Sequence, residues 1–264
     1  MAAGGLGALA AAAPLEFALK FASWRDITLG LAVATVLVAA LLWSVVPDKP
    51  MSGPAMGLRE QLVGVRQIFS NPHYWRYAPM GLFFTGGFMA IQGLWATRWM
   101  SVMEALPPAA IAQRLTWMSA SMLAGFLFMG FFATRLVHRG IRLEKVYLGA
   151  MITAALALTW LTFFPNMASG LLWPVLGFCF SLSNMSYSLV AQAFPTSLSG
   201  RANTALNLLI FAGAFGLQWG IGFLVDALQG AGWALDAAYR VSFITVLGGQ
   251  ALALLWLIRP GRRS

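Results

Sequence analysis

The sequence has few charged residues. Lys, Arg, Asp and Glu make up 9% of its 264 residues, whereas hydrophobic residues make up 59%. A soluble domain carries about 25% charged residues, because water must solvate its surface. So few charges cannot cover a water-soluble fold of this length. The composition therefore excludes a soluble protein and predicts an outer surface that faces lipid.

Residues that carry catalytic, metal or redox chemistry are also scarce. The one cysteine, Cys179, lies in an apolar stretch, and the two histidines lie far apart, so neither a disulfide framework nor a metal-ligand cluster is expected. The sequence lacks a Gly-x-x-x-x-Gly-Lys-Ser/Thr phosphate loop, a Gly-x-Ser-x-Gly elbow and a His-Glu-x-x-His pair. We therefore expect no enzyme activity, no metal and no cofactor.

Long apolar runs are abundant. A transmembrane helix needs ~20 apolar residues, because the hydrocarbon core is about 30 Å thick and each residue rises ~1.5 Å. The uncharged stretch 146–200 is long enough for two crossings, and the turn sequence at 164–170 divides it. The sequence predicts an all-α polytopic membrane protein of about eight spans: 4–21, 27–46, 77–97, 115–134, two within 146–200, 202–225 and 241–258.

The basic residues assign the orientation of these spans. Twelve of the 17 Lys and Arg residues lie on the side of the two predicted termini, and five lie on the other side. Links rich in Lys and Arg stay in the cytoplasm. We therefore expect a multi-pass protein of the bacterial cytoplasmic (inner) membrane with both termini cytoplasmic. The basic residues that give the net charge of +9 lie between spans, which indicates contact with membrane lipid and no nucleic-acid partner.

The longest link, residues 47–76, separates two groups of spans. Within it, residues 58–69 are predicted to form an amphipathic helix on the membrane surface, with Arg59 and Arg66 toward lipid headgroups. The chain is predicted to divide into two helices of an N-terminal bundle (1–46), a cytoplasmic linker (47–76), a complete six-helix C-terminal bundle (77–258) and a basic cytoplasmic tail (259–264).

A loop between two predicted spans resembles a motif of a known transporter family. The pattern runs from Gly130 through Thr134 and Arg135 to Arg139 and Gly140. It resembles the cytoplasmic loop motif of the major facilitator superfamily, in which a Gly and an Asp-Arg pair are followed by basic residues and Gly. Thr134 stands where the family has the Asp, so the acidic partner of an interdomain charge network is missing at this position.

Two further motifs resemble helix starts of the same family. Phe194-Pro195, followed by Gly200-Arg201-Ala202 and by Asn residues within 203–207, resembles the start of its eleventh helix, and Trp24-Arg25 resembles the start of its sixth. The resemblance aligns the chain with helices five to twelve of the family's twelve, as in an N-terminally truncated bacterial member. It implies a substrate cavity between two helical halves, of which this chain would hold one complete half.

Glu16 and Lys20 are the charges that lie well inside a predicted span. A charge at mid-bilayer costs about 2.5 to 3.5 kcal/mol on insertion scales, so such residues often mark ion or proton pathways. The two also stand four residues apart with Glu first, which favours an intrahelical pair. Both interpretations stay open: a structural pair, or proton coupling through Glu16.

Polar and aromatic side chains on three spans are candidates for substrate binding. By the resemblance, two of these spans are helices seven and ten, which line the family's cavity. A buried amide needs a hydrogen-bond partner, which a polar solute or water can supply, although contacts between helices can also supply it. Pairs three residues apart share a helix face. The candidates are Gln92 with Trp95, Asn184 with Tyr187, and Asn207.

Small residues on the span 202–225 predict a close contact between helices. Ala212, Gly216 and Gly220 recur at every fourth position. Small side chains at this spacing let two helix backbones approach each other. We therefore expect this face of the span to pack against a neighbouring helix.

Two functions are compatible with these patterns. The first is a secondary active transporter of the major facilitator type that moves a small solute by alternating access. If its transport is ion-coupled, the expected ion is H⁺. The second is a non-transporting membrane component, either a truncated remnant or a subunit that works with the missing N-terminal helices or with another membrane chain.

Overall fold

The computed structural model describes residues 6–7, 13–47 and 58–259, without the side chains of residues 13, 14, 16, 58, 60 and 61. Within these ranges helices are joined by short links and no strand occurs, which confirms the predicted all-α fold. The main helices are α2 (Ala13–Ala18), α3 (Trp24–Val45), α4 (Leu58–Phe69), α5 (Pro72–Met80), η1 (Gly81–Gly86), α6 (Gly87–Ala90), η2 (Ile91–Trp95), α7 (Ala96–Val102), α8 (Pro108–His138), α9 (Leu143–Phe163), α10 (Ser169–Ser183), α11 (Met185–Ala191), α12 (Thr196–Gly230) and α13 (Leu235–Ile258).

Six helical segments of the described chain are long and apolar enough to cross a membrane: α3, α8, α9, the unit α10–α11, α12 and α13. Residues 72–102 form a further helical path, α5–η1–α6–η2–α7, in place of the single predicted span 77–97. The first predicted span, 4–21, falls partly outside the described residues, and its described part contains the short helix α2. The remaining spans agree with the predicted polytopic membrane protein.

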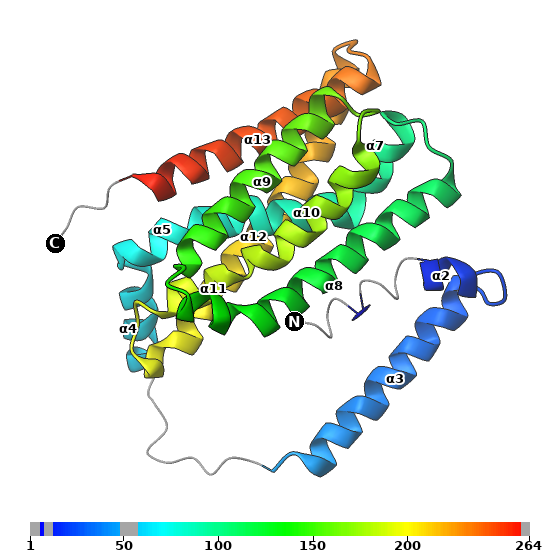
Figure 1. Cartoon of the computed structure of the whole chain (residues 1–264). Helices are drawn as coiled ribbons and strands as arrows, with labels where there is room; N and C mark the ends of the chain where they lie inside the picture. Colours follow the sequence, from blue (N-terminus) through cyan, green and yellow to red (C-terminus); the bar gives the residue numbers. More distant parts are fainter. Residues whose placement is uncertain (1–5, 8–12, 48–57, 260–264) are drawn as a thin grey trace.

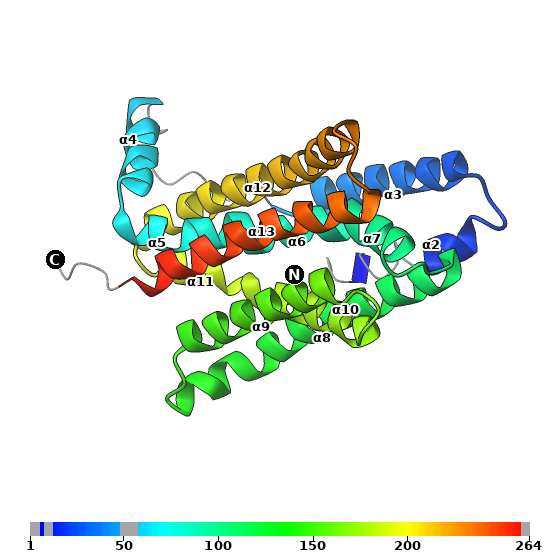
Figure 2. The ribbon, with the colours of Figure 1, turned by 90° about the horizontal axis from the view of Figure 1, so that it is seen from above.

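The helices of residues 58–259 form two groups that pack side by side (Figures 1 and 2). One group holds α12, α13 and the path α5–α7, the other holds α8, α9 and α10, and α13 packs against α9 between them. Successive helices run in opposite directions, so their links gather at two ends. We call the end with links 103–107, 164–168 and 231–234 the distal end, and the end with links 139–142 and 192–195 the proximal end.

Glycine allows α12 to touch the path α5–α7. A Cβ atom on Gly213 would lie 2.5 Å from the carbonyl oxygen of Leu82 in η1, so a larger residue would force the two backbones apart. The predicted contact at Gly216 and Gly220 is wrong, because neither Cβ position has a neighbouring atom within 4 Å. The small-residue pattern is present, but it is Gly213, outside that pattern, that contacts the neighbouring helix η1.

The buried core is rich in aromatic side chains, which join different helices. The rings of Trp99 on α7 and Phe243 on α13 stack with their centroids 4.1 Å apart. Trp173, Tyr74 and Tyr147 are also fully buried. Large planar side chains bury 150–250 Å² each, so a few of them supply much of the packing between helices.

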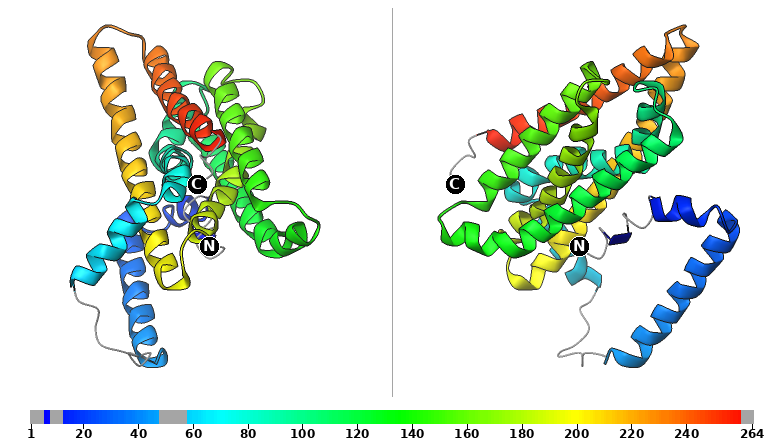
Figure 3. Two further views of the ribbon diagram at one scale, coloured as in Figure 1. Left: turned by 90° about the vertical axis from the view of Figure 1, so that its left-hand side faces the viewer. Right: turned by 45° about the vertical axis from the view of Figure 1, so that its right-hand side comes forward.

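Two elements lie outside this core. Helix α3 stands apart from the bundle of residues 58–259, has no buried residue and exposes 92% of Trp43 (Figure 3). A helix that is apolar all round and unburied by protein suits contact with lipid. Helix α4 has the predicted bounds, and its Arg59 and Arg66 are exposed. The predicted division into bundles, linker and tail stays a prediction.

Candidate functional site

Two of the predicted substrate-binding residues meet near the proximal end. Tyr187 on α11 donates a hydrogen bond from its hydroxyl group to Oδ1 of Asn207 on α12, at 2.6 Å. Tyr187 is half-buried and Asn207 is exposed. The pair therefore presents a phenol and an amide at a helix–helix junction, where both can also contact a solute.

Asn184 interrupts the helix that carries Tyr187. It ends α10 and precedes α11, and its side-chain amide donates to the carbonyl oxygens of Phe180 at 3.2 Å and Ser181 at 3.5 Å. An Asn side chain that bonds to nearby backbone competes with regular helix. The expected uninterrupted helix face shared by Asn184 and Tyr187 is therefore broken, and the Asn184 amide is used locally.

Trp95 and Gln92 lie on η2, a π-helical segment. The Trp95 ring is 8% exposed, and its Nε1 donates to the backbone carbonyl oxygen of Gln218 on α12 at 3.0 Å. Gln92 is half-buried. A π-helix bonds residue i to i+5 rather than i+4, so residues three apart no longer align as they do in an α-helix. Gln92 and Trp95 therefore differ in surroundings.

The five candidates lie at two levels of the bundle. Gln218, which meets Trp95, is eleven residues from Asn207 on the same helix, or about 16 Å along its axis at ~1.5 Å per residue. Tyr187 and Asn207 occupy one level, whereas Trp95 occupies the other. Their assignment to a substrate site remains a prediction.

The predicted proton-coupling residue, Glu16, lies on α2, but its side chain is outside the described part of the structure. Its expected partner Lys20 is exposed and lines an open groove with α8 beside Gln113, Thr116 and Trp117. The proton-coupling role of Glu16 therefore stays a prediction.

The loop motif forms the proximal end of α8. Gly140 has a φ of +77°, a left-handed conformation that favours glycine, and its N–H donates to the Val137 carbonyl oxygen at 2.9 Å. Gly140 thus ends the helix. The guanidinium group of Arg135 lies 5.5 Å from the centre of the Phe132 ring, while Arg139 and Gly130 are exposed.

An acidic group does occur beside this loop, although not at the position of Thr134. Glu144, at the start of α9, accepts hydrogen bonds from Arg76 at 3.0 Å and from the Tyr77 hydroxyl at 2.9 Å. These residues line a groove of about 460 Å³ that also includes Gly140. The charge network at the proximal end therefore joins the path α5–α7 to α9.

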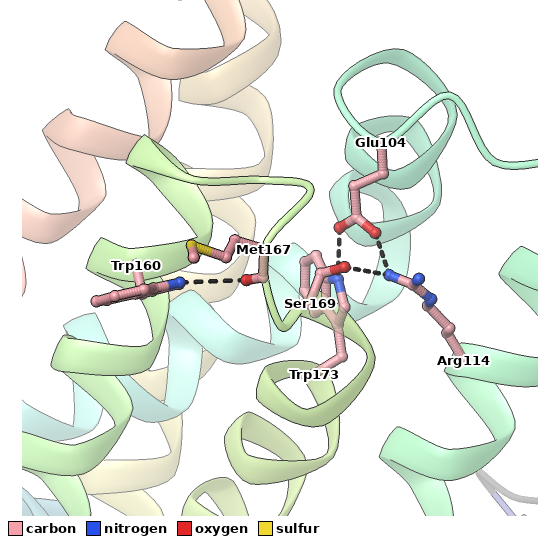
Figure 4. Close-up of polar contacts among 6 residues, drawn as sticks. All are labelled: Glu104, Arg114, Trp160, Met167, Ser169 and Trp173. Carbon is pink, nitrogen blue, oxygen red and sulfur yellow. Dashed lines mark hydrogen bonds and ion pairs between the residues drawn. The ribbon is translucent and has the colours of Figure 1, made fainter.

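A buried ion pair lies at the distal end (Figure 4). Glu104 is 7% exposed, and its carboxylate accepts hydrogen bonds from the guanidinium group of Arg114 and, at 2.9 Å, from Nε1 of Trp173. Arg114 also donates to the Ser169 hydroxyl. The four side chains come from the link 103–107, from α8 and from α10, so they tie two links of the distal end together.

The backbone around this pair is unusual. Ala105 and Ala168 have φ values of 49° and 60°, which non-glycine residues rarely adopt. Nε1 of Trp160 donates to the Met167 carbonyl oxygen at 3.1 Å and holds the neighbouring turn (Figure 4). A local hydrogen bond thus holds the link 164–168, which precedes Ser169 and Trp173.

The likeness to known proteins is structural. No protein-family model and no curated protein matches the chain. Its structure is similar to that of a bacterial homolog to the human lysosomal transporter Spinster, solved in an inward-facing and unoccupied conformation. The identity is 15% and the TM-score 0.60, over 89% of this chain and 58% of the other. Over this region the chain shares the fold of that transporter. It spans 58% of that relative's length.

Neither ion-paired cluster was predicted from the sequence. Glu104 and Arg114 lie outside the predicted spans and looked like ordinary link charges. The useful signal was the scarcity of acidic residues, 8 in the whole chain. An acid in so apolar a protein is costly to bury without a partner, so each one merits a search for a nearby cation.

Proposed function

We propose that the protein is a secondary active transporter that moves a small solute across the membrane. The observation that carries the proposal is the likeness of 89% of the chain to the structure of a transporter. The membrane-spanning helices and the polar residues on α11, α12 and η2 support it. The proposed activity is transport by alternating access rather than catalysis.

Interruptions of regular helix favour this function. The π-helical segments η1 and η2 and the break at Asn184 lie next to Gln92, Trp95 and Tyr187. Irregular helix in a membrane is tolerated where it faces protein or a water-filled cavity, and its freed backbone groups can coordinate a solute. We propose that the solute passes these positions while the two helical groups move relative to the rest of the transporter.

The direct test is uptake into proteoliposomes that contain the purified full chain. A panel of radiolabelled sugars, amino acids, organic anions and organic cations is offered with and without a pH gradient. We expect protein-dependent uptake of one class. Tyr187→Phe, which removes the bond to Asn207, should lower the rate several-fold, while the exposed-site control Thr153→Ala should not. Equal rates in protein-containing and empty vesicles for every class would contradict the proposal.

Proton coupling through Glu16 forms part of this proposal. If Glu16 carries the proton, Glu16→Gln should abolish the stimulation of uptake by a pH gradient and leave exchange of solute at equal pH intact. Stimulation that persists unchanged in Glu16→Gln would exclude this role.

A second candidate function is a membrane component that assembles with another chain. Helix α3 has no buried residue in the described structure, and the chain spans 58% of the length of its structural relative. An association would cover apolar surface that otherwise faces lipid. Native mass spectrometry of protein extracted in mild detergent should then detect a second membrane chain, and a lone chain with uptake activity would argue against it.

A further inference from the structure

A groove near the distal end combines aromatic rings with one carboxylate. It lies between η2 and α12 and has a volume of about 500 Å³, within the range of about 300–1,000 Å³ typical of small-molecule sites. Its wall contains four aromatic side chains and two polar ones. The lining residues are Leu94, Trp95, Phe215, Gln218, Trp219, Gly222, Phe223 and Asp226.

The floor of the groove is a fixed aromatic ring. Trp95 donates its Nε1–H to the Gln218 carbonyl oxygen at 3.0 Å and packs edge-on against Tyr239, with centroids 5.9 Å apart. Gly222 leaves room for the ring, since a Cβ atom there would lie 3.3 Å from Trp95. The ring is thus held in place before any ligand enters, which lowers the entropic cost of binding.

One wall of the groove belongs to α12. Trp219 and Phe223 are exposed and stack on each other, with centroids 5.4 Å apart and planes at 16°. Asp226 is exposed and lies seven residues after Trp219, so it falls on the same helix face. The aromatic surface of Trp219 and Phe223 therefore ends, along this helix face, at the carboxylate of Asp226.

The charge of the groove is negative. No Lys or Arg lines it, and in the described part of the chain no salt bridge engages Asp226.

We propose that this groove binds an organic cation with a bulky apolar or aromatic body. The carboxylate of Asp226 would pair with the cationic centre, while Trp95 and Trp219 would contact the apolar body and attract the charge through their ring faces. The inference rests on the proposed transport function, because it names the class of solute. A lipid acyl chain is the competing occupant, and it would use the rings without needing the carboxylate.

Two probes of equal shape and opposite charge test the proposal. Binding of radiolabelled tetraphenylphosphonium and of radiolabelled tetraphenylborate to the detergent-purified full chain is measured in separate samples, because the two ions precipitate each other. We expect saturable binding of the cation and none of the anion. Asp226→Asn should weaken binding by about five-fold or more, and Asp226→Glu by less than about three-fold. Asp236→Asn, at an exposed carboxylate outside the groove, should leave affinity unchanged.

The rings are tested separately. Trp219→Ala should weaken binding, whereas Trp219→Phe, which keeps an aromatic face, should retain most of the affinity. Because Trp219 is exposed, its replacement does not disturb the core, and the thermal midpoint of each variant checks this. Affinity for the cation that is the same in wild type and Asp226→Asn, equally tight binding of tetraphenylborate, or no saturable binding of the cation in wild type would each overturn the proposal. Binding is measured without transport, so uptake of another solute class would leave the transport function standing.

Discussion

Glu104 is a carboxylate enclosed in protein, with both oxygens engaged by Arg114 and Trp173. Removal of one partner of a buried ion pair is costly, about 3–5 kcal/mol, because the other charge stays buried without compensation. Replacement of the whole pair by neutral groups costs much less. At the scale of single residues, this pair therefore matters more than the exposed Arg135 and Arg139.

We predict that Arg114→Leu strongly destabilises the protein and that Glu104→Gln rescues much of the loss. The reason is that Gln keeps an acceptor for the Trp173 N–H and removes the unpaired charge. Thermal unfolding midpoints in detergent should fall by several degrees in Arg114→Leu and recover at least half of that in the double variant. Arg139→Leu, at an exposed site, serves as the control. Purely additive losses would show that the two charges do not interact.

At the scale of elements, two glycines of α12 have different surroundings. The Gly213 face lies against the Leu82 carbonyl oxygen, while Gly216 faces open space. Both residues lie within the same helix, so replacing either one by Ala changes the intrinsic helix propensity by about the same amount. A difference between their substitutions therefore reports the packing of the bundle.

We predict that Gly213→Ala destabilises the protein by about 1–3 kcal/mol, because a backbone oxygen cannot move aside without shifting a helix. Gly216→Ala should be neutral or should stabilise by up to about 1 kcal/mol, since Ala favours helix over Gly. Thermal unfolding midpoints of the two variants under identical detergent conditions provide the comparison. Equal effects would contradict the proposed contact between α12 and η1.

The spans were predictable from the sequence, but the details within them were not. Amphipathic periodicity and turn residues are local signals, so α4 and the division of 146–200 were found at or near their observed bounds. The contact face of α12 depends on how the helix is rotated against a neighbour, which the pattern at Gly216 does not encode. The break at Asn184 and the π-helical η2 were not predicted either, because hydropathy and residue spacing do not distinguish a π-helix or a one-residue break from regular α-helix.

At the scale of the whole molecule, the distal and proximal ends define the topology. The links 139–142 and 192–195 lie at one end, and the links 103–107 and 231–234 lie at the other. The positive-inside rule predicts that the proximal end is cytoplasmic. Cys179 is buried, so the native thiol gives little background in a labelling experiment.

We predict opposite accessibility for cysteines introduced at the two ends. In intact cells, a membrane-impermeant maleimide should label Gln229→Cys, which lies near the distal end, and should not label His138→Cys until the membrane is permeabilised. Both native side chains are exposed, so burial in protein does not account for a difference. Labelling of His138→Cys in intact cells would invert the predicted orientation.

The length of α12 has a consequence for the bilayer around it. Its 35 residues extend about 52 Å at ~1.5 Å per residue, well beyond a hydrocarbon core of about 30 Å. The apolar span 202–225 within it is much shorter, so the polar ends of α12, with Arg201 and Asp226, are expected to reach the headgroup regions or the water on either side.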